Sequence, residues 1–261
     1  MAKLVADHVS VEFPIYQGTS RSLRHAILLK PIGDVIRGAA NVGGAITRGH
    51  DGRVVVRALD DVNFAIEDGE RVGLIGQNGS GKTTLLRVMA GIYEPTGGVM
   101  LTSGRIVPFF NLMEGMMPEI TGRELVKVRG TLLGFSAEET TAMADDVIEF
   151  CELGDYLDMP VRTYSTGMLV RLAFAIATSV TADILLFDEL IGAGDDAFYD
   201  KAQNRLERFV ARSSSMVVAS HSRGVLQKWC NRCFLMEHGK LITTGSVDDV
   251  LRVYDERRAK A

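Results

Sequence analysis

Apolar and polar residues alternate along parts of this chain in the way that predicts β-strands. Apolar residues recur at every second position over much of Leu4–Phe13 and Leu59–Ile66, so each stretch is expected to bury one face of a sheet. Ile184–Phe187 and Met216–Ala219 are instead continuous apolar runs, which is typical of parallel strands buried on both faces. His238–Gly239 separates two further β-type runs and predicts a hairpin near the end of the sequence.

Helices are expected in the middle of the chain. Thr121 and Ser136 are each followed by a glutamate three residues later, which is the capping-box pattern that opens a helix. In the second of these helices the apolar residues form one face, and Gly154 is placed to end it. Met168–Thr178 is almost wholly apolar, which predicts a deeply packed helix. Residues 111–164 are therefore expected to form a helical insert in a mixed α/β protein.

The stretch Gly76–Thr84 carries the most specific chemical pattern in the sequence. It fits G-x-x-x-x-G-K-[ST], and it lies between a β-type run and a helical run, which disfavours the alternative of a plain glycine turn with a surface lysine. In such a loop backbone N–H groups converge on phosphate oxygens, Lys82 reaches the β- and γ-phosphates, and the Thr83 hydroxyl is a ligand of Mg²⁺. We therefore predict a nucleoside-triphosphate site formed by Gly76, Asn78, Gly79, Ser80, Gly81, Lys82, Thr83 and Thr84.

Three polar side chains that follow the buried strands complete the predicted site. Asp188 and Glu189 end one apolar run, and His221 follows the next. Asp188 is expected to contact Mg²⁺ through water, Glu189 to polarise an attacking water, and His221 to hold the γ-phosphate and that water in line. Taken singly, each is as readily a strand-end carboxylate or a loop histidine. Their order, each at a strand end, favours a hydrolytic site in which Glu189, His221 and Lys82 are catalytic.

Length, charge and cysteine content narrow the possible partners. The 261 residues suffice for one large α/β domain with a small insert, and the net charge of -4 argues against a general nucleic-acid binder. The start of the chain lacks an apolar signal core, and no apolar run approaches the ~20 residues that cross a bilayer, so a cytoplasmic location is expected. Cys230 and Cys233 have C-x-x-C spacing, but without a second pair or nearby histidines two reduced thiols are expected rather than a zinc site.

The segment from Gln17 to Arg53 is unusually long for a connection inside a compact domain. It carries six arginine and lysine residues against two aspartates, with apolar residues interleaved. Such a segment is suited to contact lipid head groups or a membrane partner, and it is equally well explained as a solvated hairpin extension. The sequence leaves both alternatives open.

The stretch Tyr164–Met168 lies just before the predicted buried helix and about twenty residues ahead of Asp188. Together with the glycine loop and the strand-end residues, it makes the chain resemble the ATP-binding subunit of an ABC transporter. Ser165 and Gly167 match the family's Leu-Ser-Gly-Gly-Gln signature, whereas the other three positions depart from it. The resemblance implies a P-loop NTPase (RecA-like) core with an antiparallel β subdomain and a helical insert. It also implies a head-to-tail homodimer, with ATP and Mg²⁺, in which Ser165 and Gly167 contact the ATP held by the other subunit.

Three further positions are assigned by the resemblance alone. Asp195 matches the family's D-loop, as does Ala193, although Gly192 and Gly194 replace the usual serine and leucine. The aromatic residue that stacks on adenine falls at Phe13 or Tyr16, and alignment of the strand favours Phe13, for which a plain core position is the alternative. The glutamine that usually opens the helical insert is absent from residues 109–113, where Asn111 is the nearest amide. The contact normally made by that glutamine is therefore unassigned.

The variant signature, Asp158–Thr163 and Phe187–Asp195 resemble one branch of the family, which exports the bacterial surface polysaccharides O-antigen, capsule and teichoic acid. The resemblance implies an ATPase at the cytoplasmic face of the bacterial inner membrane, with no transmembrane segment of its own. Two ATPase copies would act beneath two copies of a multispanning membrane subunit. They would drive export of a lipid-linked glycan, and no nucleic acid is involved.

The same resemblance implies a single ABC ATPase domain over residues 1–261. Residues 1–110 and 165–261 would form the β subdomain and the RecA-like core, and residues 111–164 the helical subdomain. No extra C-terminal glycan-binding domain is expected. The rival interpretations are an ABC ATPase of another exporter, of drugs or lipids, and a soluble ABC ATPase that acts in DNA repair or translation.

Overall fold

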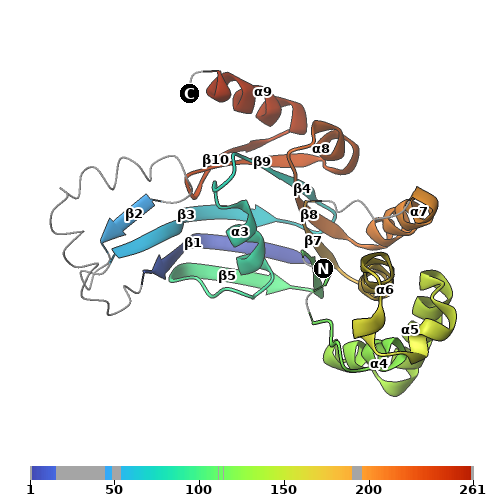
Figure 1. Ribbon diagram of the computed structural model, residues 1–261. Coiled ribbons are helices and arrows are strands. Elements are labelled where there is room, and N and C mark those ends of the chain that lie inside the picture. The colour runs from blue at the N-terminus through green and yellow to red at the C-terminus, as the bar shows by residue number, and fades with distance from the viewer. Residues whose placement is uncertain are drawn as a thin grey trace. The chain divides into compact units, whose positions relative to one another are not determined.

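The structure is a computed structural model that describes most of the chain (Figure 1). The described residues are 2–15, 45–48, 54–110, 112–113, 115–189 and 196–259, with the backbone alone at 45–48 and 196–197. They form two compact units. The first unit comprises Met1–Ile106, Leu186–Glu189 and Ser215–Ala261, and the second comprises Val107–Leu185 and Leu190–Ser214. The predictions made for Tyr16, Asn111, Asp195 and most of residues 17–53 lie outside the described residues.

An antiparallel sheet of four strands belongs to the first unit and has the order β2-β3-β1-β5. Its strands are β1 (Lys3–Pro14), β2 (Ala45–Arg48), β3 (Val54–Ile66) and β5 (Gly97–Ser103). The apolar residues of the alternating stretches are buried, as Val9 and Val11 of β1 illustrate. The prediction of the two long strands is confirmed, with β3 beginning at Val54 rather than at Leu59.

The second sheet has six strands in the order β10-β9-β4-β8-β7-β6. Its strands are β4 (Arg71–Ile75), β6 (Ile106–Phe109), β7 (Ile184–Asp188), β8 (Ser215–Ala219), β9 (Arg232–Glu237) and β10 (Lys240–Gly245). Strand β4 runs parallel to both β8 and β9, and β9 and β10 form the predicted antiparallel hairpin. Every residue of β8 is buried, which explains why its sequence is a continuous apolar run instead of an alternating one.

Three helices accompany the strands of the first unit: α3 (Lys82–Met89), α8 (Arg223–Trp229) and α9 (Val247–Arg258). Helix α3 begins directly after the glycine loop. Helix α9 contacts β9, β10 and α8, and the Ser246 hydroxyl caps it by accepting a hydrogen bond from the backbone N–H of Asp249. Within the part of the chain that the structure describes, no helix is both long enough and apolar enough to span a bilayer.

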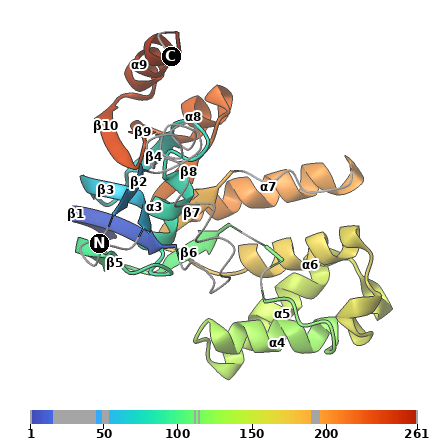
Figure 2. The ribbon, with the colours of Figure 1, turned by 60° about the vertical axis from the view of Figure 1, so that its left-hand side comes forward.

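The second unit is mainly helical (Figure 2). Its helices are α4 (Gly122–Leu132), α5 (Ala137–Cys151), the short 3₁₀ turns η1 (Gly154–Asp158) and η2 (Val161–Thr163), α6 (Thr166–Thr178) and α7 (Asp196–Arg212). Both predicted capping boxes are formed, at Thr121 for α4 and at Ser136 for α5. The side chain of Phe174 on α6 is fully buried, and its ring lies 6.0 Å from the ring of Phe150 on α5. Helices α5 and α6 therefore pack against each other through these aromatic side chains.

The end of α5 differs from the prediction. Gly154 does not cap this helix, because the helix ends at Cys151 and Glu152 takes the left-handed conformation, with a φ of 54°. The carboxylate of Glu152 forms an ion pair with Lys201 of α7, and the same ammonium donates a hydrogen bond to the carbonyl oxygen of Phe150. A side-chain anchor from a helix distant in sequence thus holds the glutamate in a conformation that glycine usually supplies.

Candidate nucleotide-binding site

Close packing of backbone requires glycine in the loop between β4 and α3. A Cβ atom on Gly76 would lie 2.2 Å from the carbonyl oxygen of Met236, and one on Gly81 would lie 2.8 Å from that of Ala58. Gly79 and Gly81 also have φ angles of 78° and 104°, which residues with side chains adopt at a cost. The loop is therefore fixed in shape by its neighbours before any ligand arrives.

Lys82 is the first residue of α3 and its side chain is buried. Its ammonium group donates hydrogen bonds to the carbonyl oxygens of Gly76, at 2.7 Å, and Gln77, at 3.0 Å. Burial lowers the pKa of Lys82, and the nearby carboxylates of Asp188 and Glu189 oppose that shift. The carbonyl oxygens of the loop thus hold the partly desolvated ammonium group of Lys82. This group can exchange those oxygens for the oxygens of a bound anion.

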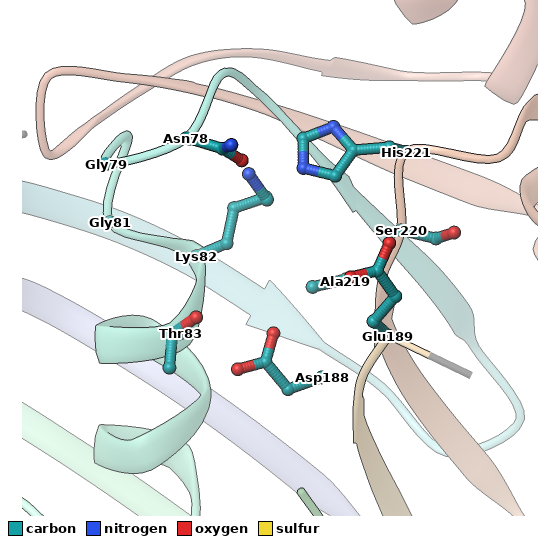
Figure 3. A pocket seen from close by; sticks show the side chains of 10 residues that line it. All are labelled: Asn78, Gly79, Gly81, Lys82, Thr83, Asp188, Glu189, Ala219, Ser220 and His221. Atoms are coloured by element: carbon teal, nitrogen blue, oxygen red, sulfur yellow. The ribbon is translucent and has the colours of Figure 1, made fainter. Parts of the chain in front are cut away.

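Lys82 and the other predicted catalytic side chains line one cavity of about 320 Å³ (Figure 3). Lys82 and Thr83 come from the start of α3, Asp188 and Glu189 from the end of β7, and His221 from the end of β8. In Figure 3 His221 lies across the cavity from Thr83. All the lining residues belong to the first unit. They are Asn78, Gly79, Gly81, Lys82, Thr83, Asp188, Glu189, Ala219, Ser220 and His221.

Two lining residues had no role in the sequence prediction. Ala219 is the last residue of β8 and Ser220 follows it. The carbonyl oxygen of Ala219 accepts a hydrogen bond of 2.9 Å from the backbone N–H of Glu189. The sequence did contain a signal for Ser220, because it is a polar residue that stands beside His221 after an apolar strand. Ala219 takes part through its backbone carbonyl oxygen, and no sequence pattern predicts such a contact.

Glu189 has a backbone conformation that is uncommon for its residue type, with a φ of 64°. Its side chain is exposed to the cavity, and the hydrogen bond to Ala219 holds its backbone. A left-handed glutamate costs on the order of 1 kcal/mol or more, and such residues gather at functional sites. The conformation is therefore consistent with a carboxylate that is positioned for chemistry rather than for stability.

The residues of the cavity fit a nucleotide triphosphate with Mg²⁺. The Thr83 hydroxyl and the Asp188 carboxylate supply the oxygen ligands that Mg²⁺ prefers. The hydroxyl oxygen of Ser80, in the glycine loop, is buried and has no hydrogen-bond partner among the described residues. A buried polar atom without a partner is costly, and a polar ligand in the loop is one way to satisfy it. Lys82 adds the positive charge that a phosphate group needs.

Comparison with known proteins identifies the chain. The family model described as ABC transporter matches residues 59–192. The chain belongs to the ABC transporter family. It is 43% identical to the O-antigen export system ATP-binding protein RfbE of Yersinia enterocolitica, over 95% of this chain and 99% of that protein.

Two other relatives agree with this assignment, and one solved structure has the same fold. The chain is 34% identical to the O-antigen export system ATP-binding protein RfbB of Klebsiella pneumoniae, over 97% of each chain. It is also 34% identical to the teichoic acids export ATP-binding protein TagH of Listeria innocua, over 97% of this chain and 70% of that protein. A dimeric ATP-binding cassette bound to ADP and Pi has the same fold, with a TM-score of 0.63 and 19% identity over 94% of this chain and 98% of that one. The predicted P-loop NTPase fold with an antiparallel sheet is thus confirmed.

The residues that match the ABC transporter signature lie at the start of α6, in the second unit. The Ser165 hydroxyl caps this helix by accepting a hydrogen bond of 3.2 Å from the backbone N–H of Met168, and Ser165 and Gly167 are both exposed. Tyr164, which departs from the family pattern, is buried, and its hydroxyl donates a hydrogen bond of 2.6 Å to the carbonyl oxygen of Tyr156. The larger residue therefore anchors the signature stretch within its own unit.

Phe13, the predicted adenine contact of this ABC transporter protein, lies near the end of β1 and is 37% exposed. Its ring packs edge-on against Tyr93, with 5.4 Å between ring centroids, and the Tyr93 hydroxyl accepts a hydrogen bond from Arg87. Phe13 is not among the residues that line the nucleotide cavity. Because Phe13 is partly exposed, it is not a fully buried core residue. Its stacking on adenine stays a prediction.

The two cysteines with C-x-x-C spacing are free thiols. Burial raises the pKa of Cys230 and of Cys233 to about 12, so neither forms a thiolate readily. Both sulfur atoms pack near Gly73 of β4. The interpretation as two reduced thiols agrees with this packing.

Proposed function

We propose that this chain is the ATP-hydrolysing subunit of an exporter of lipid-linked polysaccharide. One observation carries the enzymatic part. Lys82 and Thr83 of the glycine loop share a single cavity with Asp188, Glu189 and His221. That set contains a cation for phosphate, oxygen ligands for Mg²⁺ and a candidate general base.

The chemistry follows from the position of each side chain. Lys82 would leave the carbonyl oxygens of Gly76 and Gln77 and bind the β- and γ-phosphates. Glu189 would accept a proton from the attacking water, and His221 would hold that water and the γ-phosphate in line. When bound between Thr83 and Asp188, Mg²⁺ would neutralise charge on the phosphate oxygens. The products are ADP and inorganic phosphate.

We further propose that two copies of the chain close around two ATP molecules. Ser165 and Gly167 of one copy would bind the γ-phosphate held by Lys82 of the other, and Asp195 would lie at the same junction. Support comes from the start of α6, which is exposed and presents backbone N–H groups to an anion. Closure would depend on ATP because only the closed dimer uses both sets of contacts.

The export substrate and the membrane partner are inferred from the named relatives. Proteins called O-antigen and teichoic acids export ATP-binding proteins match this chain over 95% or more of its length. We propose a multispanning partner in the inner membrane, contacted by the helical subdomain of residues 111–164. Met113 and Met117 in that region are exposed, and methionine adapts well to irregular partner surfaces. Ordinary loop packing is the alternative for these two residues.

Co-purification in detergent from the native membrane tests this proposal. Wild type and Glu189→Gln, each tagged, should recover the same multispanning protein together with a lipid-linked glycan, with more of the complex for Glu189→Gln when ATP is present. Recovery of a membrane protein without any glycan would favour an exporter of drugs or lipids. Recovery of an active ATPase that brings down ribosomes or DNA instead would reject the export function.

A further inference from the structure

The second unit contains a cavity of about 500 Å³ that none of the nucleotide-site residues lines. It lies between α5, the end of α6 and α7, and Figure 2 shows α7 running alongside α6. A volume of this size is typical of sites for small ligands. The lining residues are Asp146, Phe150, Thr178, Ser179, Lys201, Asn204, Arg205, Arg208, Phe209 and Arg212.

The charge of this cavity is strongly unbalanced. Lys201, Arg205, Arg208 and Arg212 recur along α7 at spacings of four, three and four residues, so they form one stripe on the helix. All four line the cavity, and Asp146 is the one carboxylate among the lining residues. Like charges at these spacings repel each other, which costs stability unless anions offset them.

Two of the four cations have structural roles. Arg205 forms an ion pair with Asp146, and its Nε donates a hydrogen bond of 2.6 Å to the Thr178 hydroxyl. Its guanidinium also lies over the ring of Phe150, 4.2 Å from the centroid. Lys201 is held by the carboxylate of Glu152. These contacts tie α7 to α5 and α6, and they account for the local acidic groups at the cavity.

The other two cations have no such partner. Arg208 and Arg212 are exposed, and neither forms an ion pair or a hydrogen bond with any other residue that the structure describes. Asn204 lies one turn before Arg208 on the same helix and also faces the cavity. A guanidinium presents a planar fork of donors that matches a phosphate group, and two forks with an amide offer several charge-assisted hydrogen bonds to one ligand.

We propose that this cavity, which we call the α7 pocket, binds a phosphate-bearing anion distinct from the ATP of the nucleotide site. Arg208, Arg212 and Asn204 contact the phosphate, and Lys201 and Arg205 contribute positive charge from fixed positions. A phosphate fits better than a carboxylate because its oxygens, arranged as a tetrahedron, can accept from two guanidinium forks at once, and a phosphomonoester or pyrophosphate also carries more than one negative charge. The proposal does not depend on the export substrate. The phosphate can belong to a soluble molecule or to a lipid head group, and these two sources are separable by experiment.

The test uses the full-length chain with Lys82→Ala as background, because pyrophosphate also suits the glycine loop. The test variant adds Arg208→Gln and Arg212→Gln, and the matched control adds Arg123→Gln and Lys127→Gln, which remove the same two charges from α4. Calorimetry measures binding of inorganic pyrophosphate, and co-sedimentation measures binding to phosphatidylglycerol vesicles, with phosphatidylcholine vesicles as reference. The melting temperature should stay unchanged in the α7 variant, since Arg208 and Arg212 are exposed. It should fall only slightly in the control, where Arg123 gives up a solvent-exposed ion pair with Asp158.

A soluble ligand predicts saturable pyrophosphate binding that weakens about tenfold or more in the α7 variant and persists in the control. A lipid head group predicts the same pattern for phosphatidylglycerol vesicles without saturable pyrophosphate binding. The proposal is overturned if neither probe binds, or if the α7 variant and the α4 control lose binding equally. Equal loss would mean that net charge alone attracts these anions.

Discussion

Replacing Lys82 with methionine tests how the glycine loop exchanges its own contacts for a phosphate. In the free protein the ammonium donates to the carbonyl oxygens of Gly76 and Gln77. Transfer to ATP gives up these two hydrogen bonds, which involve a charged donor and are worth about 1.5 kcal/mol each. An ammonium and a phosphate oxygen ~3 Å apart gain about 5 kcal/mol at an effective dielectric constant of ~20. The net gain of about 2 kcal/mol predicts that Lys82→Met binds MgATP about 30-fold more weakly.

Calorimetry with a non-hydrolysable ATP analogue and Mg²⁺ measures this loss. Adenosine serves as a second ligand, because it lacks phosphates and its affinity should not change. Lys240→Met is the matched control, since Lys240 is exposed and pairs with Asp60 on the surface. A weakening of less than ~5-fold for the analogue would refute the role of Lys82. Equal weakening for adenosine would show that the loop itself had collapsed.

The buried ammonium also makes a prediction about pH. Burial holds the pKa of Lys82 below its ordinary value of 10.5. Between that lowered pKa and 10.5 the unfolded chain binds more protons at this group than the folded chain does, so the free energy of unfolding rises with pH. Lys82→Met lacks this contribution. The melting temperature of wild type should therefore rise relative to that of Lys82→Met as pH approaches 10.5. A difference between the two melting temperatures that does not change with pH would contradict the desolvation argument.

Three further predictions concern other parts of the structure. Gly81→Ala places a Cβ 2.8 Å from a backbone oxygen at a φ of 104°, so it should lower stability by about 2 kcal/mol or more and abolish nucleotide binding, as measured by thermal melting and calorimetry. Tyr164→Phe removes the hydrogen bond to Tyr156 and should cost about 1 kcal/mol in denaturant unfolding, whereas an unchanged midpoint would contradict that anchor. Cys230 and Cys233, with pKa values of about 12, should resist iodoacetamide at pH 8 until the chain unfolds, and rapid labelling of the native protein would argue against their burial.

Local sequence patterns were enough to predict most of the strands and helices. The alternation that gave β1 and β3, and the apolar runs that gave β7 and β8, reflect which faces are buried. Capping boxes fixed the starts of α4 and α5 because they act within four residues. The end of α5 was missed for the opposite reason, since Glu152 is held by Lys201, a residue distant in sequence.

In the candidate site, too, local sequence patterns were predictive, whereas features that depend on tertiary contacts were not. The glycine loop was recognisable because its spacing encodes its geometry. That Asp188, Glu189 and His221 lie in one cavity with it was predictable because each follows a buried strand, and such strands end at one edge of a sheet. The buried Ser80 hydroxyl without a partner and the left-handed backbone of Glu189 depend on tertiary packing, so no pattern announces them. The α7 pocket escaped notice because two of its cations pair with acidic groups of α5 and its C-terminal end, which are distant in sequence. Only the structure shows which two have no such partner among the residues that it describes.

ATP-dependent dimerisation of Glu189→Gln tests the central claim most directly. Size-exclusion chromatography with light scattering would compare this variant with wild type at saturating ATP and Mg²⁺, alongside phosphate release. If Glu189 activates the attacking water, Glu189→Gln should bind ATP, lose hydrolysis and elute as a stable dimer, whereas wild type should hydrolyse ATP and return to monomer. A variant that stays monomeric at saturating ATP, or one that hydrolyses ATP at the wild-type rate, would contradict the account.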